Sequence, residues 1–422
     1  MEVPKLFGSL RVMIAVVEME DHGGVANQIV NLAVGLKKRA VHVIVLVRNP
    51  LAVSNPYREQ LIAEEVPVWS PLQGHYLVVR DFCRICLWLL CPVALLDASI
   101  RRKNLSASRS SIWGVLRRMG YWGLDGLFLL QLTRGKIEQK VRIIQFRNPD
   151  CWYFIKWAKR LGYKTNYLED TIVPPDSKYH YYGLASVLSD VDMFSAISVA
   201  AAASLKPICP PNTVIKVMQC IVERPPTTLI SAANDLKPIR IGYLGRLDKQ
   251  KDIYTLISAT KIAVQAGSPM KLSIYGDGPE RDKLEKYALD LDLPSNVVFF
   301  KGRFPRQNLP DVMGELDIVA LPSLSEGLGV VLVEAMSYGK PVVATAVGGI
   351  KEVVVQNVTG ILVPPASPDL FAKALISIAA DPEKYYKMSI SAHDMYESTF
   401  HPSRIISEYI GLFEETATIT QN

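Results

Sequence analysis

The feature that most constrains this fold is a regular alternation of short apolar runs and helical stretches that starts near residue 237. The apolar runs include IRIGYL, KLSIYG, NVVFF, DIVALPS, PVVAT and GILV. Short apolar runs separated by helical patterns are typical of a parallel sheet with helices on both faces. The second half of the chain therefore predicts a doubly wound α/β domain.

The first half contains units of the same kind. An apolar run at 12–17, the loop DHGG and a helical stretch precede a second apolar run at 41–47, and similar units occur around VRIIQF (141–146) and KTNYLED (164–170). A chain of 422 residues is long enough for two domains. Six prolines between 207 and 238 mark an interdomain linker. We predict domains at 1–225 and 226–397.

The most informative stretch runs from Asp317 to Val354 and carries two carboxylates on either side of a glycine-rich turn. An apolar strand ends before Glu326, Gly327 and Gly329 open a helix, and Glu334 lies on that helix. A helix that begins at the carboxyl end of a parallel strand presents unpaired N–H groups to an anion such as phosphate.

The two carboxylates suit a nucleotide-linked sugar. Glu334 can accept hydrogen bonds from a ribose diol, and Glu326 from the hydroxyls of a second group beyond the phosphates. Each could instead be an ordinary solvated acid, because short motifs match by chance. Glu334 stands in the apolar run VVLVEAM, however, and a buried carboxylate is costly without a partner.

Two cations form a second candidate site. Arg246 and Lys251 follow the strand IRIGYL, at the same edge of the predicted sheet. They can clamp a diphosphate and stabilise its charge as it leaves. A basic, exposed helix start is the alternative, although cations there are mildly unfavourable without an anion.

Weaker candidates are the pair Gly23 and Gly24, which can approach a phosphate closely or form a simple turn, and Arg303, which could border a nucleobase or be a solvated loop cation. Asp190 and Asp192 have the spacing of a metal–diphosphate site, but their context favours a helix end. We predict no metal site.

The chain resembles the retaining glycosyltransferases of GT-B fold known as glycosyl transferases group 1. The resemblance is strong from about Ile239 to Asp381. It covers GRL with Lys251 five residues after Arg246, YGDGPER, the spacing Glu326 to Glu334 within PSLSEGLGVVLVEAMSYGKPVVAT, GGIKEVV and TGILVPP. The first half matches loosely, through DHGGVANQIVNLA and SAISVAAAA.

The resemblance implies a role for each site residue. Glu334 would bind the ribose, Glu326 the transferred sugar, Arg246 and Lys251 the diphosphate, and the amides of Gly327, Leu328 and Gly329 the same region. It also implies two Rossmann-like domains facing a cleft, a helix at 398–422 that returns to the first domain, and transfer with retention and without a metal or other cofactor.

Departures from the family pattern lie mainly in the first half. Asp252 replaces the usual glycine after the clamp lysine, and Gln145-Phe146-Arg147 stands where relatives often carry a histidine. Asp170 and His22 are the acceptor-side candidates that remain.

The formal charge of +6 is concentrated in one insertion, residues 76–142. This segment has twelve Lys or Arg against four Asp or Glu, a net +8, so the rest of the chain is at −2. It also holds three tryptophans and the apolar run ICLWLLCPVALL. Basic, aromatic and apolar residues together are typical of a segment in an anionic membrane interface, although a buried helical excursion has a similar composition.

We therefore expect a cytoplasmic hexosyltransferase-type enzyme, with attachment to the inner membrane face as one interpretation. It would move a sugar from a nucleotide donor to a glycan or lipid-linked acceptor in polysaccharide or glycoconjugate biosynthesis. Neither a signal peptide nor a spanning helix is predicted, nor nucleic-acid binding. The alternatives are a nucleotide-sugar epimerase or hydrolase, and a non-catalytic nucleotide-sugar-binding protein.

Overall fold

The computed structural model contains two compact units. Unit 1 comprises Met1–Leu168, Tyr179–Phe194 and Ile410–Asn422, and unit 2 comprises Glu169–Lys178 and Ser195–Tyr409. The residues that the structure describes are 10–16, 19, 24–49, 51–52, 54–70, 130–137, 139–147, 152–173, 187–223, 225 and 238–419. Gly23, His22 and most of the insertion at 76–142 lie outside them.

The first sheet has seven strands in the order β3-β2-β1-β4-β5-β6-β7. They are β1 (Arg11–Val16), β2 (His42–Val47), β3 (Val68–Trp69), β4 (Ile143–Arg147), β5 (Lys164–Glu169), β6 (Met193–Ala196) and β7 (Ile215–Val217). β1 pairs in parallel with both β2 and β4, so the strand order reverses beside β1. The stretches 12–17, 41–47, 141–146 and 164–170 contain strands as predicted; β3, β6 and β7 are short strands that the pattern did not predict.

The second sheet lies within unit 2 and has six strands in the order β10-β9-β8-β11-β12-β13. They are β8 (Ile239–Leu244), β9 (Met270–Tyr275), β10 (Val298–Gly302), β11 (Ile318–Leu321), β12 (Val342–Thr345) and β13 (Gly360–Val363). Each pairs in parallel with its neighbours. The predicted fold class, two parallel-sheet Rossmann-like α/β units, is confirmed.

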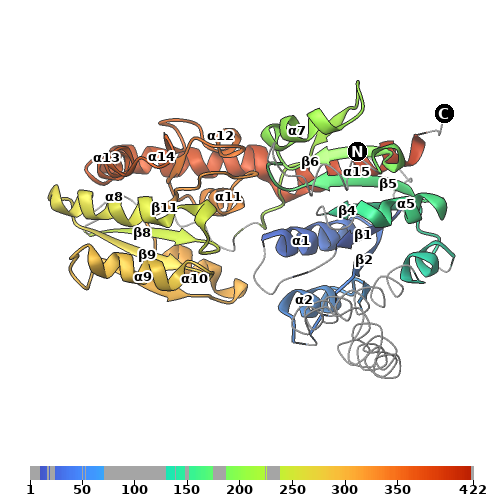
Figure 1. Ribbon diagram of the computed structural model, residues 1–422, viewed down its shortest axis with the longest axis horizontal. Coiled ribbons are helices and arrows are strands. Elements are labelled where there is room, and N and C mark those ends of the chain that lie inside the picture. The colour runs from blue at the N-terminus through green and yellow to red at the C-terminus, as the bar shows by residue number, and fades with distance from the viewer. Residues whose placement is uncertain are drawn as a thin grey trace, which may run out of the picture. The chain divides into compact units, whose positions relative to one another are not determined.

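Helices cover both sides of each sheet (Figure 1). Connections between parallel strands are right-handed, so helices that lead in opposite directions along the sheet lie on opposite faces. In the first sheet these are α1 (Gly24–Lys38) and α2 (Pro56–Ala63) against α5 (Trp152–Arg160) and α7 (Val199–Leu205).

In unit 2, α8 packs against both α9 and α13. The helices of this unit are α8 (Ile253–Gln265), α9 (Arg281–Asp290), α10 (Leu309–Gly314), α11 (Val330–Ser337), α12 (Ile350–Val353), α13 (Pro368–Ala379) and α14 (Pro382–Met395). The last helix, α15 (Pro402–Thr418), runs through the division between the units.

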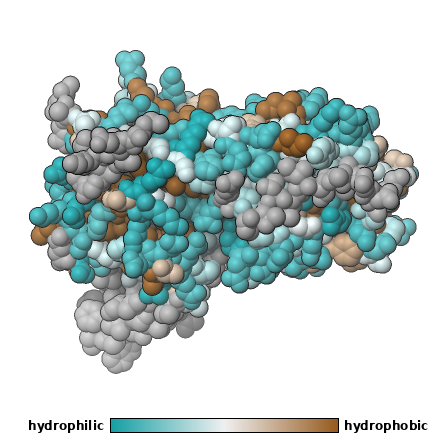
Figure 2. Space-filling view, turned by 180° about the vertical axis from the view of Figure 1, so that it is seen from behind, coloured by the Kyte–Doolittle hydropathy of each residue, from teal (hydrophilic) through white to brown (hydrophobic). Residues whose placement is uncertain are grey.

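Burial of apolar strand residues stabilises both sheets. The side chains of β1, β4, β11 and β12 are almost wholly buried, as expected for parallel strands covered on both faces. On the face shown in Figure 2 the described surface is mainly hydrophilic, with small separate hydrophobic groups. Among the helices of the described residues, none combines the length and hydrophobicity that crossing a bilayer requires.

Lys340, just before β12, is an exception to the apolar core. Its side chain is 2% exposed, and burial lowers its pKa to about 8. The folded state therefore releases this proton at a lower pH than the unfolded chain, whose lysines keep a pKa near 10.4. Between these values the unfolded chain binds more protons, so deprotonation of Lys340 favours folding as pH rises.

We predict that the free energy of unfolding includes a contribution from Lys340 that rises between about pH 8 and pH 10.5. Urea unfolding of the wild type and of Lys340→Met across this range would isolate it, because other titrating groups cancel in the difference. The stability advantage of Lys340→Met should shrink with pH. A difference that stays constant would contradict the buried, depressed lysine.

Candidate functional site

The loops after five strands of the second sheet meet along its carboxyl edge. Three of them are joined by backbone hydrogen bonds: Gly245 N donates to Tyr275 O at 3.0 Å, and Gly276 N to Gly302 O at 2.8 Å. A Cβ at Gly276 would lie 1.8 Å from Gly245 O, which is why the turn needs glycine there. The loop YGDGPER is thus a tight turn, and it supports the loop GRL.

Lys251 and Glu326 come together where the strand order of this sheet reverses. Lys251 ends a 3₁₀ turn, Lys249–Lys251, after β8, and Glu326 lies in the loop after the neighbouring strand β11. Lys251 Nζ is 2.6 Å from Glu326 Oε2, and both side chains are largely buried. Ligands of open α/β sheets bind at such a reversal point, so the pair stands where a ligand is expected.

The polypeptide on either side of this pair is fixed. Gln250 Nε2 donates to Ser325 O at 2.8 Å, and Leu324 N donates to Gln250 O at 2.7 Å. Ser323 Oγ donates to Glu326 Oε2 at 3.3 Å. The carboxylate is therefore held by a lysine and a hydroxyl, and the two loops are joined by the side-chain amide and the backbone carbonyl of Gln250.

The structure explains how Asp252 replaces the family's glycine. Asp252 has φ +45°, in the left-handed region that glycine enters without cost and that Asp tolerates better than most residues. Its Oδ2 accepts a 2.6 Å hydrogen bond from Thr255 Oγ1 in the first turn of α8. The side chain thus offsets part of the strain.

Glu334 is buried, and its partner was not predicted. Its side chain is 8% exposed, and Arg306 Nη2 lies 2.6 Å from its Oε1. Arg306 follows β10 and is three residues beyond Arg303, the cation that the sequence singled out. The sequence could have pointed to Arg306 because it follows a predicted strand at the carboxyl edge of the sheet. We considered only Arg303 there, because it stands next to a glycine.

Arg246 and Arg303 are less constrained. The Arg246 side chain is 63% exposed, with Nε 3.9 Å from Asp248 Oδ2. Arg303 Nε is 3.5 Å from Asp277 Oδ2, and both side chains are more than a third exposed. Exposed pairs of this kind contribute little to stability, so these cations can exchange their partners for a ligand.

The turn Gly327-Leu328-Gly329 opens α11. Gly329 has φ +86° and is the N-cap residue, so the first amides of the helix lack intrahelical acceptors. A Cβ on Gly327 would lie 2.3 Å from the carbonyl oxygen of Asp170. The structure therefore places the backbone of Asp170, an acceptor-side candidate, directly against this turn.

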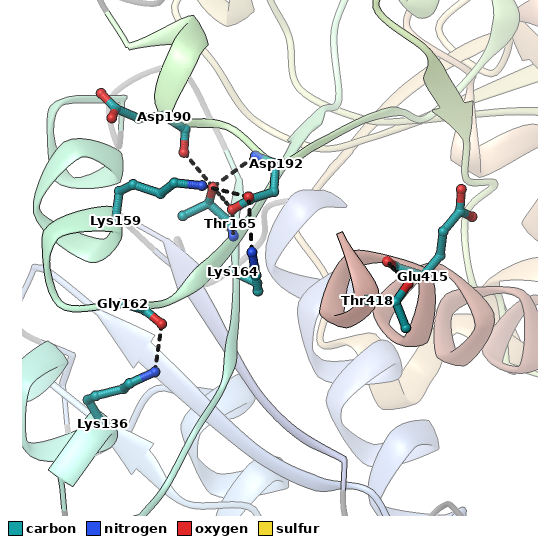
Figure 3. Close-up of polar contacts among 9 residues, drawn as sticks. All are labelled: Lys136, Lys159, Gly162, Lys164, Thr165, Asp190, Asp192, Glu415 and Thr418. Carbon is teal, nitrogen blue, oxygen red and sulfur yellow. Dashed lines mark hydrogen bonds and ion pairs between the residues drawn. The ribbon is translucent and has the colours of Figure 1, made fainter. Parts of the chain in front are cut away.

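The remaining candidates lie elsewhere. Gly24 is the first residue of α1 in unit 1, and Gly23 and His22 are outside the described residues. Asp192 is bound by two lysines and a threonine: Lys159 Nζ at 2.5 Å, Lys164 Nζ at 3.7 Å and Thr165 N at 2.8 Å (Figure 3). This carboxylate joins the starts of β5 and β6. In the described ranges no group of three side chains could hold a metal ion.

We predict that Gly327→Ala lowers the free energy of unfolding by about 1–3 kcal/mol, because its methyl group would collide with the Asp170 carbonyl. Urea unfolding measures the loss. Gly411→Ala in α15 is the control: no atom lies within 4 Å of its added Cβ, and alanine favours a helix. Equal stability of Gly327→Ala and wild type would show that the turn and residue 170 do not pack this closely.

The comparisons with known proteins cover different parts of the chain. Residues 228–395 match the family model described as glycosyl transferases group 1. A D-inositol 3-phosphate glycosyltransferase of Corynebacterium urealyticum is 33% identical over 156 residues, 35% of this chain and 37% of the relative. An alpha-D-kanosaminyltransferase of Streptomyces kanamyceticus is 30% identical over 181 residues, 43% of this chain and 46% of the relative. The chain thus spans less than half the length of these curated relatives.

Solved structures are similar over nearly the whole chain. Anabaena HepE in complex with UDP and glucose has a TM-score of 0.72 at 18% identity, over 96% of this chain and 100% of that one. TarM has a TM-score of 0.72 at 12% identity, over 96% and 99%. These likenesses show the fold. The chain has the two-sheet GT-B fold, and its residues 228–395 match a glycosyltransferase family.

Proposed function

We propose that this protein is a glycosyltransferase that binds a nucleotide sugar along the carboxyl edge of the second sheet. The observation that carries the proposal is the meeting of Lys251 and Glu326 at the strand-order reversal, beside the free helix start at Gly329 and the buried Glu334. A diphosphate needs cations and amides, and a ribose diol needs a carboxylate. Lys251 follows β8, and the amides and Glu334 lie on the turn and the helix that follow the neighbouring strand β11.

The charges indicate how the donor would bind. Glu334 Oε1 is engaged by Arg306, which leaves its Oε2 for the ribose diol. Lys251 is neutralised by Glu326. A diphosphate would draw Lys251 toward itself and release the Glu326 carboxylate to hydroxyls of the transferred sugar. Arg246, with most of its side chain exposed, would join Lys251 on the phosphates.

Transfer would break the bond between the anomeric carbon and the phosphate oxygen and form one to an acceptor oxygen, which loses its proton. The leaving diphosphate gains negative charge, and Lys251 and Arg246 would stabilise it without a divalent ion.

We infer retention of anomeric configuration from the family resemblance. One curated relative, a GDP-mannose-dependent alpha-(1-6)-phosphatidylinositol monomannoside mannosyltransferase of Mycolicibacterium smegmatis, is named for a lipid-linked acceptor, and it supports an acceptor of that kind here.

The test is a thermal-shift and turnover panel of UDP-, GDP-, ADP- and dTDP-linked sugars, with and without EDTA and with a membrane extract as acceptor source. We predict that one donor class stabilises the wild type and is consumed only when acceptor is present. Glu326→Ala and Glu334→Gln should lower turnover by at least about a hundredfold, the scale of one lost transition-state interaction. Glu383→Gln, an exposed carboxylate on α14, is the control.

Other outcomes separate the alternatives. Donor consumption without acceptor would indicate an epimerase or hydrolase, and donor binding without product would indicate a binding protein. No shift with any donor, or full turnover by both variants, would contradict the proposal.

We also propose that unit 1 docks on an anionic membrane, where a lipid-linked acceptor would be found. The basic insertion at 76–142 extends into described residues: those among 130–164 contain nine Lys or Arg and no acidic residue, although Arg147 is buried and Lys159 and Lys164 pair with Asp192. Trp157 on α5 is 46% exposed, with the Arg160 guanidinium 5.1 Å from its ring centroid. Ile137 is 71% exposed, and its neighbour Lys136 donates to Gly162 O at 2.7 Å, just after α5 (Figure 3).

Exposed aromatic and aliphatic side chains among cations suit a lipid interface. We predict that the full chain sediments with vesicles of phosphatidylglycerol and not with phosphatidylcholine, and that salt weakens binding. Trp157→Ala with Arg160→Gln should reduce binding severalfold. Lys384→Gln with Lys387→Gln on α14 is the control. Equal binding to both lipids, or an unaffected double variant, would contradict this surface.

A further inference from the structure

Two carbonyls of the turn that carries Glu326 are held from the same part of unit 2. Ser198 Oγ donates to Gly327 O at 2.6 Å, and Gly349 N donates to Glu326 O at 3.1 Å. The Ser198 bond joins residues 129 positions apart, and Ser198 is wholly buried. Both carbonyl groups are therefore fixed in direction.

Fixing these carbonyls also directs two N–H groups. In a trans peptide the C=O and the following N–H point to opposite sides of one plane. The bond to Ser198 thus turns Leu328 N–H away from α7, and the bond from Gly349 turns Gly327 N–H away from α12. Neither N–H donates to any residue in the described part of the chain. Both are free for an anion.

Ser198 is itself held rigidly. Its Oγ accepts a 3.0 Å hydrogen bond from Ala201 N as the N-cap of α7. The Glu352 carboxylate accepts from Val199 N at 2.8 Å and from Ala200 N at 2.9 Å. A Cβ on Gly349 would lie 2.9 Å from Ser198 Cβ and 2.1 Å from Gly327 O. Ser198, Gly349 and the Gly327 carbonyl are therefore packed so closely that only glycine fits at residue 349.

We propose that Ser198 is a positioning residue for the donor diphosphate, fixed in turn by Glu352. It acts through the Gly327–Leu328 peptide, whose N–H it aims at the distal phosphate of the nucleotide. This inference rests on the proposed function. The new element is that Ser198, which precedes the second sheet by about forty residues, sets the geometry of the turn Gly327-Leu328-Gly329. Amides oriented before the ligand arrives need no reorganisation when it binds.

The experiment compares two serine variants with a matched N-cap control. Ser198→Ala removes the hydroxyl and the cap, whereas Ser198→Gly removes the hydroxyl and keeps a residue that N-caps tolerate. Asp381 caps α14 by accepting from Lys384 N at 3.0 Å, so Asp381→Ala loses a cap far from the turn. Titration calorimetry with UDP, GDP, ADP and dTDP, and with their monophosphates, supplies the readout.

We expect both Ser198 variants to bind the preferred nucleoside diphosphate about tenfold more weakly. Their affinity for the monophosphate should stay within about twofold of wild type, and Asp381→Ala should match wild type for both. Ser198→Gly with wild-type diphosphate affinity, or an equal loss for diphosphate and monophosphate, would overturn the positioning role alone. A wild type that binds none of the diphosphates would overturn the proposed function and this inference together.

Discussion

The parallel pairing of the second sheet is the constraint on which the candidate site depends. Parallel strands end at one edge, so the loops after β8, β9, β10, β11 and β12 are gathered there although they span more than a hundred residues of sequence. The strand order reverses between β8 and β11, and the chain leaves these two strands in opposite directions. Because the two loops lead away from each other, a crevice is expected between them. The largely buried side chains of Lys251 and Glu326 form their ion pair there.

The carboxyl edge of the second sheet carries buried, paired charges. Two carboxylates, Glu326 and Glu334, are largely buried, and each is paired with a cation from another loop of the same sheet edge. Buried charges are costly unless they are paired and hydrogen-bonded. A structural role alone could be filled by apolar residues at lower cost. Ion pairs that a charged ligand can rearrange are what the proposed donor site requires at this edge of the sheet.

Much of the second half could be predicted from the sequence, because strand and helix periods there are regular and each apolar run is bounded by glycine, proline or a charge. The positions of Glu326, Glu334 and Lys251 on loops and a helix start followed directly. Arg306, Ser198 and Glu352 could not be found in this way. Their roles come from contacts between segments separated by 28, 129 and about 150 residues, which local patterns do not report. The short strands β3, β6 and β7 were missed because two to four residues carry too little periodicity.

The most direct test of the central claim is a structure of the protein with the nucleotide sugar that stabilises it. We expect the diphosphate against the amides of Gly327 and Leu328, the ribose diol within hydrogen-bond distance of Glu334, and Lys251 moved from Glu326 to the phosphates. A nucleotide bound away from the carboxyl edge of the second sheet, with the Lys251–Glu326 pair intact, would contradict it.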